Sequence, residues 1–72
     1  MEIKLFGATW CPACRQAKEF LDVNAIIYDY IDVDLESENA QEIGVRFIPH
    51  LIAGEETVIG YNYEKYKKIF NT

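Results

Sequence analysis

The spacing of apolar residues along this chain changes from a two-residue period to a helical period at Cys11. Glu2–Phe6 alternates polar and apolar side chains, which is typical of a half-buried strand that Gly7 would end. From Cys11 to about Leu21, polar and charged residues separate apolar ones that recur at helical spacing. These apolar residues are Cys14, Ala17, Phe20 and Leu21. A strand that leads directly into a helix predicts the start of a β-α-β unit.

The next segment completes this unit and adds a second helix. Ile26–Val33 is rich in β-branched and aromatic residues, so it predicts a second strand. A short helix is expected after it, with Ser37 as its N-cap and Gly44 just past its end. Its inward-facing residues would be Ala40 and Ile43.

The last third of the chain predicts a hairpin followed by a helix. Leu51–Ala53 and Thr57–Ile59 flank a turn at Gly54–Glu56. Asn62 suits the N-cap of a final helix, whose apolar stripe would contain Tyr63, Tyr66, Ile69 and Phe70. The predicted order is therefore β-α-β-α-β-β-α. It corresponds to an α/β fold with a four-stranded mixed sheet flanked by helices on both faces, in which the first two strands are parallel.

Composition limits the classes of partner. The 72 residues are half apolar, which is enough for one domain over residues 1–72 and for no second one. Twelve acidic and seven basic side chains give a net charge of -5, which argues against nucleic acid and anionic membranes as partners. There is no bilayer-length apolar run, and Met1–Phe6 lacks the features of a signal peptide, so we expect a cytoplasmic monomer.

The residues that can carry chemistry lie at the junction between the first strand and the first helix, in Cys11-Pro12-Ala13-Cys14. Pro12 suits the first helical turn, so Cys11 is expected near the N-cap, where free N–H groups and the helix dipole stabilise a thiolate. Cys14 follows one turn later and is expected to be more buried. We therefore predict a thiol-disulfide oxidoreductase that needs no cofactor, with Cys11 as the nucleophile and Cys14 as the resolving thiol.

Several residues near this motif have more than one interpretation. Trp10 would either cover the base of the site or form an apolar surface on which partners dock. Arg15 is a solvated helix residue or a charge that favours the thiolate. The alternative to redox chemistry is a metal or iron-sulfur module that uses Cys11, Cys14 and His50, although three ligands fall short of a closed zinc site.

Three segments together resemble the glutaredoxin branch of the thioredoxin superfamily: Cys11–Cys14, Phe47–Leu51 and Val58–Tyr61. The resemblance implies a thioredoxin-like fold with a cis Ile48–Pro49 bond beside the two cysteines. It also implies that the residues in contact with the substrate are Trp10, Pro12, Ile48, Pro49, Gly60 and Tyr61.

Other positions depart from the family pattern. Ala8 stands where glutathione-binding glutaredoxins have a basic residue, and Tyr63 stands where they have an aspartate. Leu5 occupies the position of the buried aspartate of thioredoxins. The chain is most similar to glutaredoxin-like redoxins with thioredoxin-like activity, which implies an electron donor to protein disulfides, with ribonucleotide reductase among the candidate substrates. It also implies that a flavoprotein disulfide reductase, rather than glutathione, supplies the electrons.

Overall fold

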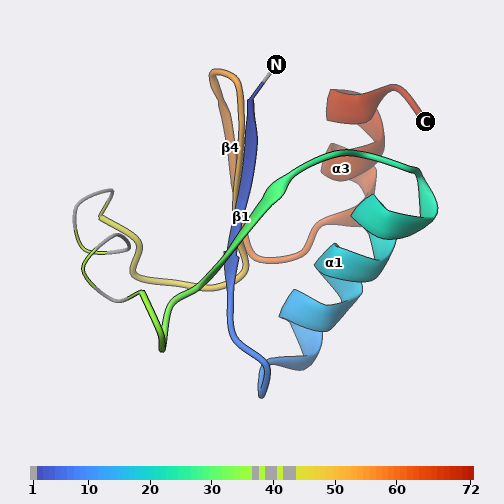
Figure 1. Ribbon diagram of the computed structural model, residues 1–72. Coiled ribbons are helices and arrows are strands. Elements are labelled where there is room, and N and C mark those ends of the chain that lie inside the picture. Colours follow the sequence, from blue (N-terminus) through green and yellow to red (C-terminus); the bar gives the residue numbers. More distant parts are fainter. Residues whose placement is uncertain (1, 37, 39–40, 42–43) are drawn as a thin grey trace.

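The computed structural model of the protein describes residues 2–36, 38, 41 and 44–72 (Figure 1). Its elements are β1 (Ile3–Gly7), α1 (Pro12–Val23), β2 (Asp29–Asp32), β3 (His50–Ala53), β4 (Glu56–Ile59) and α3 (Tyr63–Phe70). The strand order is β2-β1-β3-β4, with β1 parallel to β2 and the other two pairs antiparallel, which confirms the predicted mixed sheet. Neither helix in the described part of the chain is long and apolar enough to cross a membrane.

All four strands differ from their predicted bounds; β3 and β4 each begin one residue earlier than expected, at His50 and Glu56. β1 extends through Gly7, which pairs with Asp32 in the parallel ladder. β2 is shorter than the predicted Ile26–Val33, because the backbone amide of Ile26 still donates to Leu21 at the end of α1. The chain must therefore leave the helix before it can pair with β1.

The predicted helix between β2 and β3 lies mostly outside the described residues. Ser37, Ala40 and Ile43, on which the prediction rested, are not described, so a helix there stays a prediction. Gly44 is described, and its φ of +81° is a left-handed conformation that glycine adopts readily.

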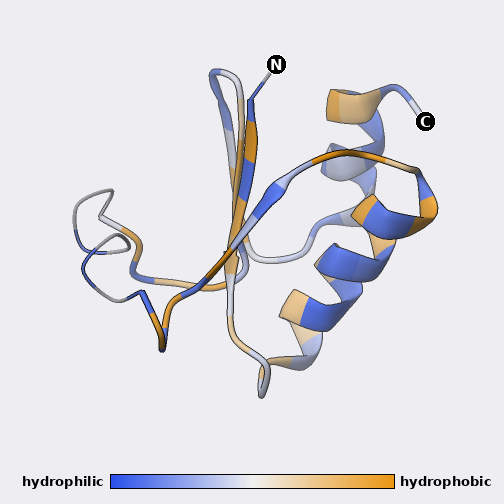
Figure 2. Ribbon diagram, viewed as in Figure 1, coloured by the Kyte–Doolittle hydropathy of each residue, from blue (hydrophilic) through white to orange (hydrophobic). Residues whose placement is uncertain are grey.

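The main core lies between the sheet and the two described helices, which cover the same face of the sheet (Figure 1). The sheet and helices alternate hydrophobic and hydrophilic residues, as Figure 2 shows along β1 and α1. This alternation gives the sheet a second apolar cluster around Phe6 and Ile31 on its other face. The buried residues of the main core are Ile3, Leu5, Ala17, Phe20, Leu21, Leu51, Ala53, Val58 and Tyr66.

One residue of the predicted stripe of α3 does not lie in this core. Tyr63 is 52% exposed, whereas Tyr66, one turn later, is fully buried. Tyr63 is the first residue of the helix and approaches Phe20 of the core edge-on, with ring centroids 5.8 Å apart. Its position at the end of the helix leaves most of the ring in solvent.

Asn62 begins α3, and its removal provides a test of how the helix is held. Its Oδ1 accepts a hydrogen bond from the backbone amide of Lys65 at 3.1 Å. We expect Asn62→Ala to lower the free energy of unfolding by about 1 kcal/mol, because an amide of the first turn loses its partner. Urea denaturation measures this loss. Asn62→Ser retains an acceptor and should stay within a few tenths of a kcal/mol of the wild type, so equal losses in both variants would contradict the capping role.

Candidate dithiol active site

The connection between β1 and α1 fixes the position of the first cysteine. Ala8 is buried directly after β1, and its carbonyl accepts a hydrogen bond from the backbone amide of Cys11 at 3.2 Å. Cys11 has an extended backbone (φ -94°, ψ 111°) and is the N-cap of α1, as predicted. Pro12 follows in the first turn, where its missing N–H leaves no helical bond unmade. The local sequence thus positions the Cys11 sulfur at the positive end of the helix.

The two cysteines contact each other through a capping hydrogen bond. The backbone amide of Cys14 donates to Cys11 Sγ, with an N–S distance of 3.3 Å. Both cysteines are free thiols; Cys11 is 7% exposed and Cys14 is 1% exposed. A reagent that enters from solvent therefore meets Cys11 first, and Cys14 lies one turn behind it.

The protonation of Cys14 differs from that of an ordinary thiol. Burial raises the pKa of Cys14 to about 12, and the hydrogen bond with the Cys11 side chain acts in the same direction. The backbone of Ala8 acts in the opposite direction but does not outweigh the loss of solvent. Cys14 is therefore a protonated thiol at neutral pH, which is the state required of a group that acts second.

Arg15 is the charged side chain closest in sequence to the two cysteines. The first turn of the helix carries no acidic residue. Arg15 is exposed, and its guanidinium forms no hydrogen bond or ion pair within the described residues. This favours the interpretation of Arg15 as a solvated helix residue.

Trp10 extends from the loop before the cysteines toward the end of β2. It is 66% exposed, which favours the interpretation that it forms an apolar surface on which partners dock. Its indole N–H donates to Asp34 Oδ2 at 2.8 Å, and the backbone amide of Asp34 donates to Asp32 Oδ1 at 2.9 Å. Asp34 was not singled out from the sequence. The signal available was the parallel pairing of β1 and β2, because the carboxyl ends of parallel strands meet at one edge of a sheet.

The segment before β3 joins the site from the other side. The Ile48–Pro49 bond is cis, which confirms the expectation. Ile48 packs against the cluster formed by Ala8, Cys11 and Cys14. The buried Pro49 accepts a hydrogen bond from the backbone amide of Gly60 through its carbonyl at 2.8 Å. Three of the predicted substrate-contact residues therefore come together here.

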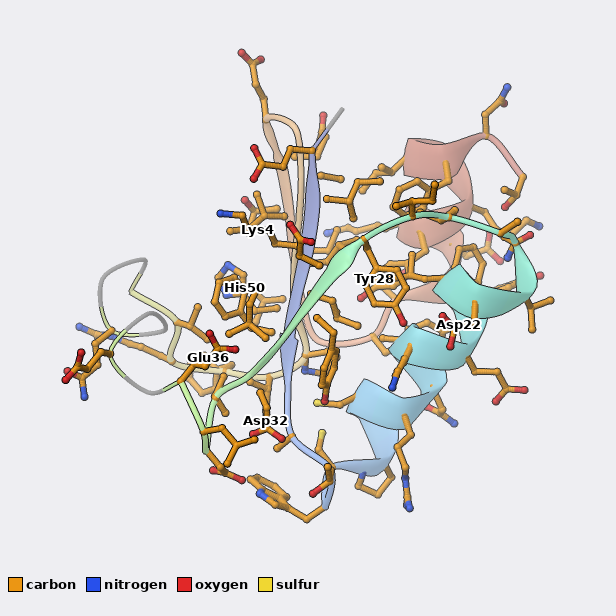
Figure 3. The ribbon with its side chains drawn as sticks, viewed as in Figure 1. Lys4, Asp22, Tyr28, Asp32, Glu36 and His50 are labelled. Atoms are coloured by element: carbon orange, nitrogen blue, oxygen red, sulfur yellow. The ribbon has the colours of Figure 1, made fainter. Side chains whose placement is uncertain are left out.

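Two residues singled out in the sequence lie elsewhere. Tyr61 packs edge-on against Tyr66 in the main core, with ring centroids 5.1 Å apart. His50 contacts Phe6, and Figure 3 shows it on the side of β1 away from α1. Its neighbour Leu51 faces the main core, so the pleat directs His50 to the opposite face. Burial lowers the pKa of His50, and its Nδ1 has no partner among the described residues.

The alternative metal site is not assembled. In the described part of the chain, no three histidine, cysteine, aspartate or glutamate side chains form a group that could hold a metal ion. Cys11 caps α1 and Cys14 lies in its first turn, whereas His50 lies on the side of β1 away from α1.

Two free cysteines one turn apart at a helix N-terminus, beside a cis-proline, define a dithiol site of the thioredoxin-like type. The chain belongs to the glutaredoxin family, whose model matches residues 3–58. Membership of this family implies thiol oxidoreductase activity in general. A search of curated proteins gave no significant match.

Solved structures support the same fold. A mutant of the thioredoxin-like protein BC3987 superposes with a TM-score of 0.89 at 26% identity, over 97% of this chain and 95% of that one. The glutaredoxin-like NrdH-redoxin from Escherichia coli superposes with a TM-score of 0.85 at 24% identity, over 94% of this chain and 93% of that one. Glutaredoxin grx-1 from Archaeoglobus fulgidus has a TM-score of 0.80 at 25% identity, over 99% of this chain and 87% of that one. The chain therefore has the thioredoxin-like fold over nearly all of its length.

The difference between the two thiols predicts selective alkylation. At pH 8, iodoacetamide should modify Cys11 of the reduced protein and leave most Cys14 unmodified, because the thiol with a pKa of about 12 is protonated and enclosed. Mass spectrometry of proteolytic peptides locates the label. In urea both cysteines should react alike; preferential labelling of Cys14 in the folded protein would contradict this description of the site.

Proposed function

We propose that this protein reduces disulfide bonds of other proteins, with Cys11 as the attacking thiolate and Cys14 as the resolving thiol. The observation that carries the proposal is the pairing of Cys11 at the N-cap of α1 with a protonated, enclosed Cys14 one turn later. The helix end stabilises negative charge on the first sulfur, and the burial of the second keeps it from competing for the substrate.

The reaction proceeds by two exchanges of sulfur partners. The Cys11 thiolate attacks one sulfur of the target disulfide, a mixed disulfide forms, and the other target sulfur leaves as a thiolate that takes a proton from water. Cys14 then loses its proton and attacks Cys11 Sγ, which releases the second target sulfur. The target gains two electrons and two protons, and the protein is left with a Cys11–Cys14 disulfide.

The surface around the cysteines favours a protein as substrate. Trp10 directly precedes Cys11 and is exposed, and Phe47, which directly precedes Ile48–Pro49, is exposed as well. Exposed aromatic side chains of this kind supply affinity when a partner buries them. The charged groups that would recognise a small anionic ligand are absent at Ala8, which is fully buried, and at Tyr63.

The division of labour between the cysteines is tested by single substitutions. We expect Cys11→Ser to abolish reduction of a protein disulfide, because no nucleophile remains at the helix end. Cys14→Ser should still attack and should accumulate a mixed disulfide at Cys11, which added dithiothreitol releases. Mass spectrometry of the trapped adduct makes the assignment, and an adduct on Cys14 in the Cys11→Ser variant would reverse it.

The source of electrons is a second test of the proposal. We expect a flavoprotein disulfide reductase of the thioredoxin reductase type to reduce the oxidised protein faster than glutathione does. The net charge of -5 and the uncharged Ala8 disfavour an anionic tripeptide, whereas a protein donor gains from burial of the exposed Trp10.

The measurement is turnover with each donor at matched physiological concentration. Trp10→Ala should weaken the reaction with the reductase more than the reaction with glutathione, since only the protein donor buries the indole. Efficient, saturable reduction by glutathione with no response to the reductase would sink this part of the proposal.

A further inference from the structure

The surroundings of Cys14 contain one polar side chain that the mechanism above leaves without a task. On the face of the sheet beneath α1, β1 presents the apolar Ile3 and Leu5 and ends in Gly7. Leu5 pairs in register with Tyr30 of the parallel strand β2. Residues paired in register present their side chains to the same face, so Tyr30 also lies beneath α1.

Gly7 brings the Tyr30 hydroxyl and the Cys14 sulfur close to a common point. A Cβ atom placed on Gly7 would lie 3.1 Å from Tyr30 Oη and 3.3 Å from Cys14 Sγ. It would also lie 3.1 Å from Cys14 Cβ, which is tighter than ordinary contact. The hydroxyl and the sulfur therefore both border the space that the missing side chain at Gly7 leaves open.

Tyr30 is held in this position by its ring. The ring packs against the main core on one side, and Lys18 Nζ lies 4.9 Å from its centroid. The Tyr30 hydroxyl forms no hydrogen bond within the described residues, so its proton is available to a new acceptor at the site.

We propose that the Tyr30 hydroxyl donates a hydrogen bond to the Cys14 thiolate as that thiolate forms in the resolving step. This inference rests on the proposed function, in which Cys14 must become an anion inside a nearly solvent-free site. A buried anion without a donor is costly, and a hydrogen bond to a charged group is among the stronger ones. The lost proton passes to solvent, and the departing target thiolate takes up a proton in turn.

Tyr30 acts here as a donor and not as the base. Burial raises the pKa of Tyr30, and the nearby charges of Asp32 and Asp34, together with those of Cys14 and Cys11 when they are ionised, raise it further. The hydroxyl therefore keeps its own proton throughout the reaction and stabilises the charge on sulfur without accepting a proton.

The other titratable groups that face Cys14 or Tyr30 come from three elements. They are Cys11 and Lys18 of α1, Asp32 and Asp34 at the end of β2, and Tyr66 of α3. Tyr66 is the competing donor, because its buried hydroxyl has no partner among the described residues. The comparison of Tyr30→Phe with Tyr66→Phe separates the two.

The experiment follows one reaction of the reduced protein with Ellman's reagent in a stopped-flow instrument. The first nitrothiobenzoate is released when Cys11 attacks, at a rate proportional to reagent concentration. The second is released when Cys14 resolves the adduct, at a rate independent of that concentration. We expect Tyr30→Phe to leave the first phase unchanged and to slow the second about tenfold, which displaces its dependence on pH upward by about one unit.

Tyr28→Phe is the matched control. The Tyr28 hydroxyl donates to Asp22 Oδ1 at 2.8 Å, and Figure 3 shows these two side chains pointing toward each other beside α1. This variant also loses a tyrosine hydroxyl that adjoins α1, yet both phases should match the wild type. Tyr66→Phe should leave the second phase within about twofold of the wild type.

The outcomes separate the inference from the function on which it rests. An unchanged second phase in Tyr30→Phe, or a slow second phase in Tyr66→Phe alone, would overturn the inference while the proposed function stands. Slowing of both phases in Tyr30→Phe would indicate a structural disturbance and would also overturn it. If the wild-type protein released only one nitrothiobenzoate, the proposed dithiol mechanism itself would fail.

Discussion

The hydrogen bond from the Cys14 backbone amide to Cys11 Sγ joins the folding of α1 to the chemistry of the site. It satisfies an amide of the first turn, as any N-cap does, but the capping atom is the sulfur that would attack a substrate. The helix begins at Cys11 for the same reason that the sulfur is stabilised there, because free N–H groups converge on it. The start of α1 and the position of the nucleophile are therefore one structural constraint.

The burial of Cys14 has two opposite consequences. It keeps the second sulfur protonated and away from solvent, which prevents it from reacting first. In the proposed mechanism it would also make the Cys14 thiolate costly to form when the mixed disulfide is resolved. Gly7 permits both effects, since its lack of a side chain lets Cys14 pack on the end of β1 and leaves room for the Tyr30 hydroxyl.

The sequence was sufficient to predict the features that depend on neighbours along the chain. The capping positions of Cys11 and Asn62 and the buried face of α1 follow from residue type and helical spacing, and the structure has them as predicted. The cis bond before Pro49 was implied by family resemblance, not by the dipeptide itself. Local pattern also placed Tyr63 in the apolar stripe, where the end of a helix leaves it exposed.

Features that depend on register could not be predicted in the same way. Tyr30 lies beneath Cys14 because it pairs with Leu5, and a shift of one residue would have directed it to the other face. The contact between Trp10 and Asp34 joins residues 24 positions apart, and no local pattern specifies it. His50 is an intermediate case: Leu51 lies in the main core, and the alternation of a strand directs its neighbour His50 to the opposite face.

These register-dependent contacts assign a larger role to β2 than its short length suggests. Tyr30 lies beneath the dithiol within the strand, and Asp34, just past its end, binds the indole of Trp10 on the outer side. One segment thus contacts both the buried thiol and the exposed aromatic surface. The parallel pairing of β1 with β2 holds this segment beside the cysteines, as Val33 also donates to the carbonyl of Gly7 at 2.9 Å. A substitution that shifts β2 along β1 would therefore disturb the surroundings of Cys14 and the exposed side chain of Trp10 together, although it touches neither cysteine.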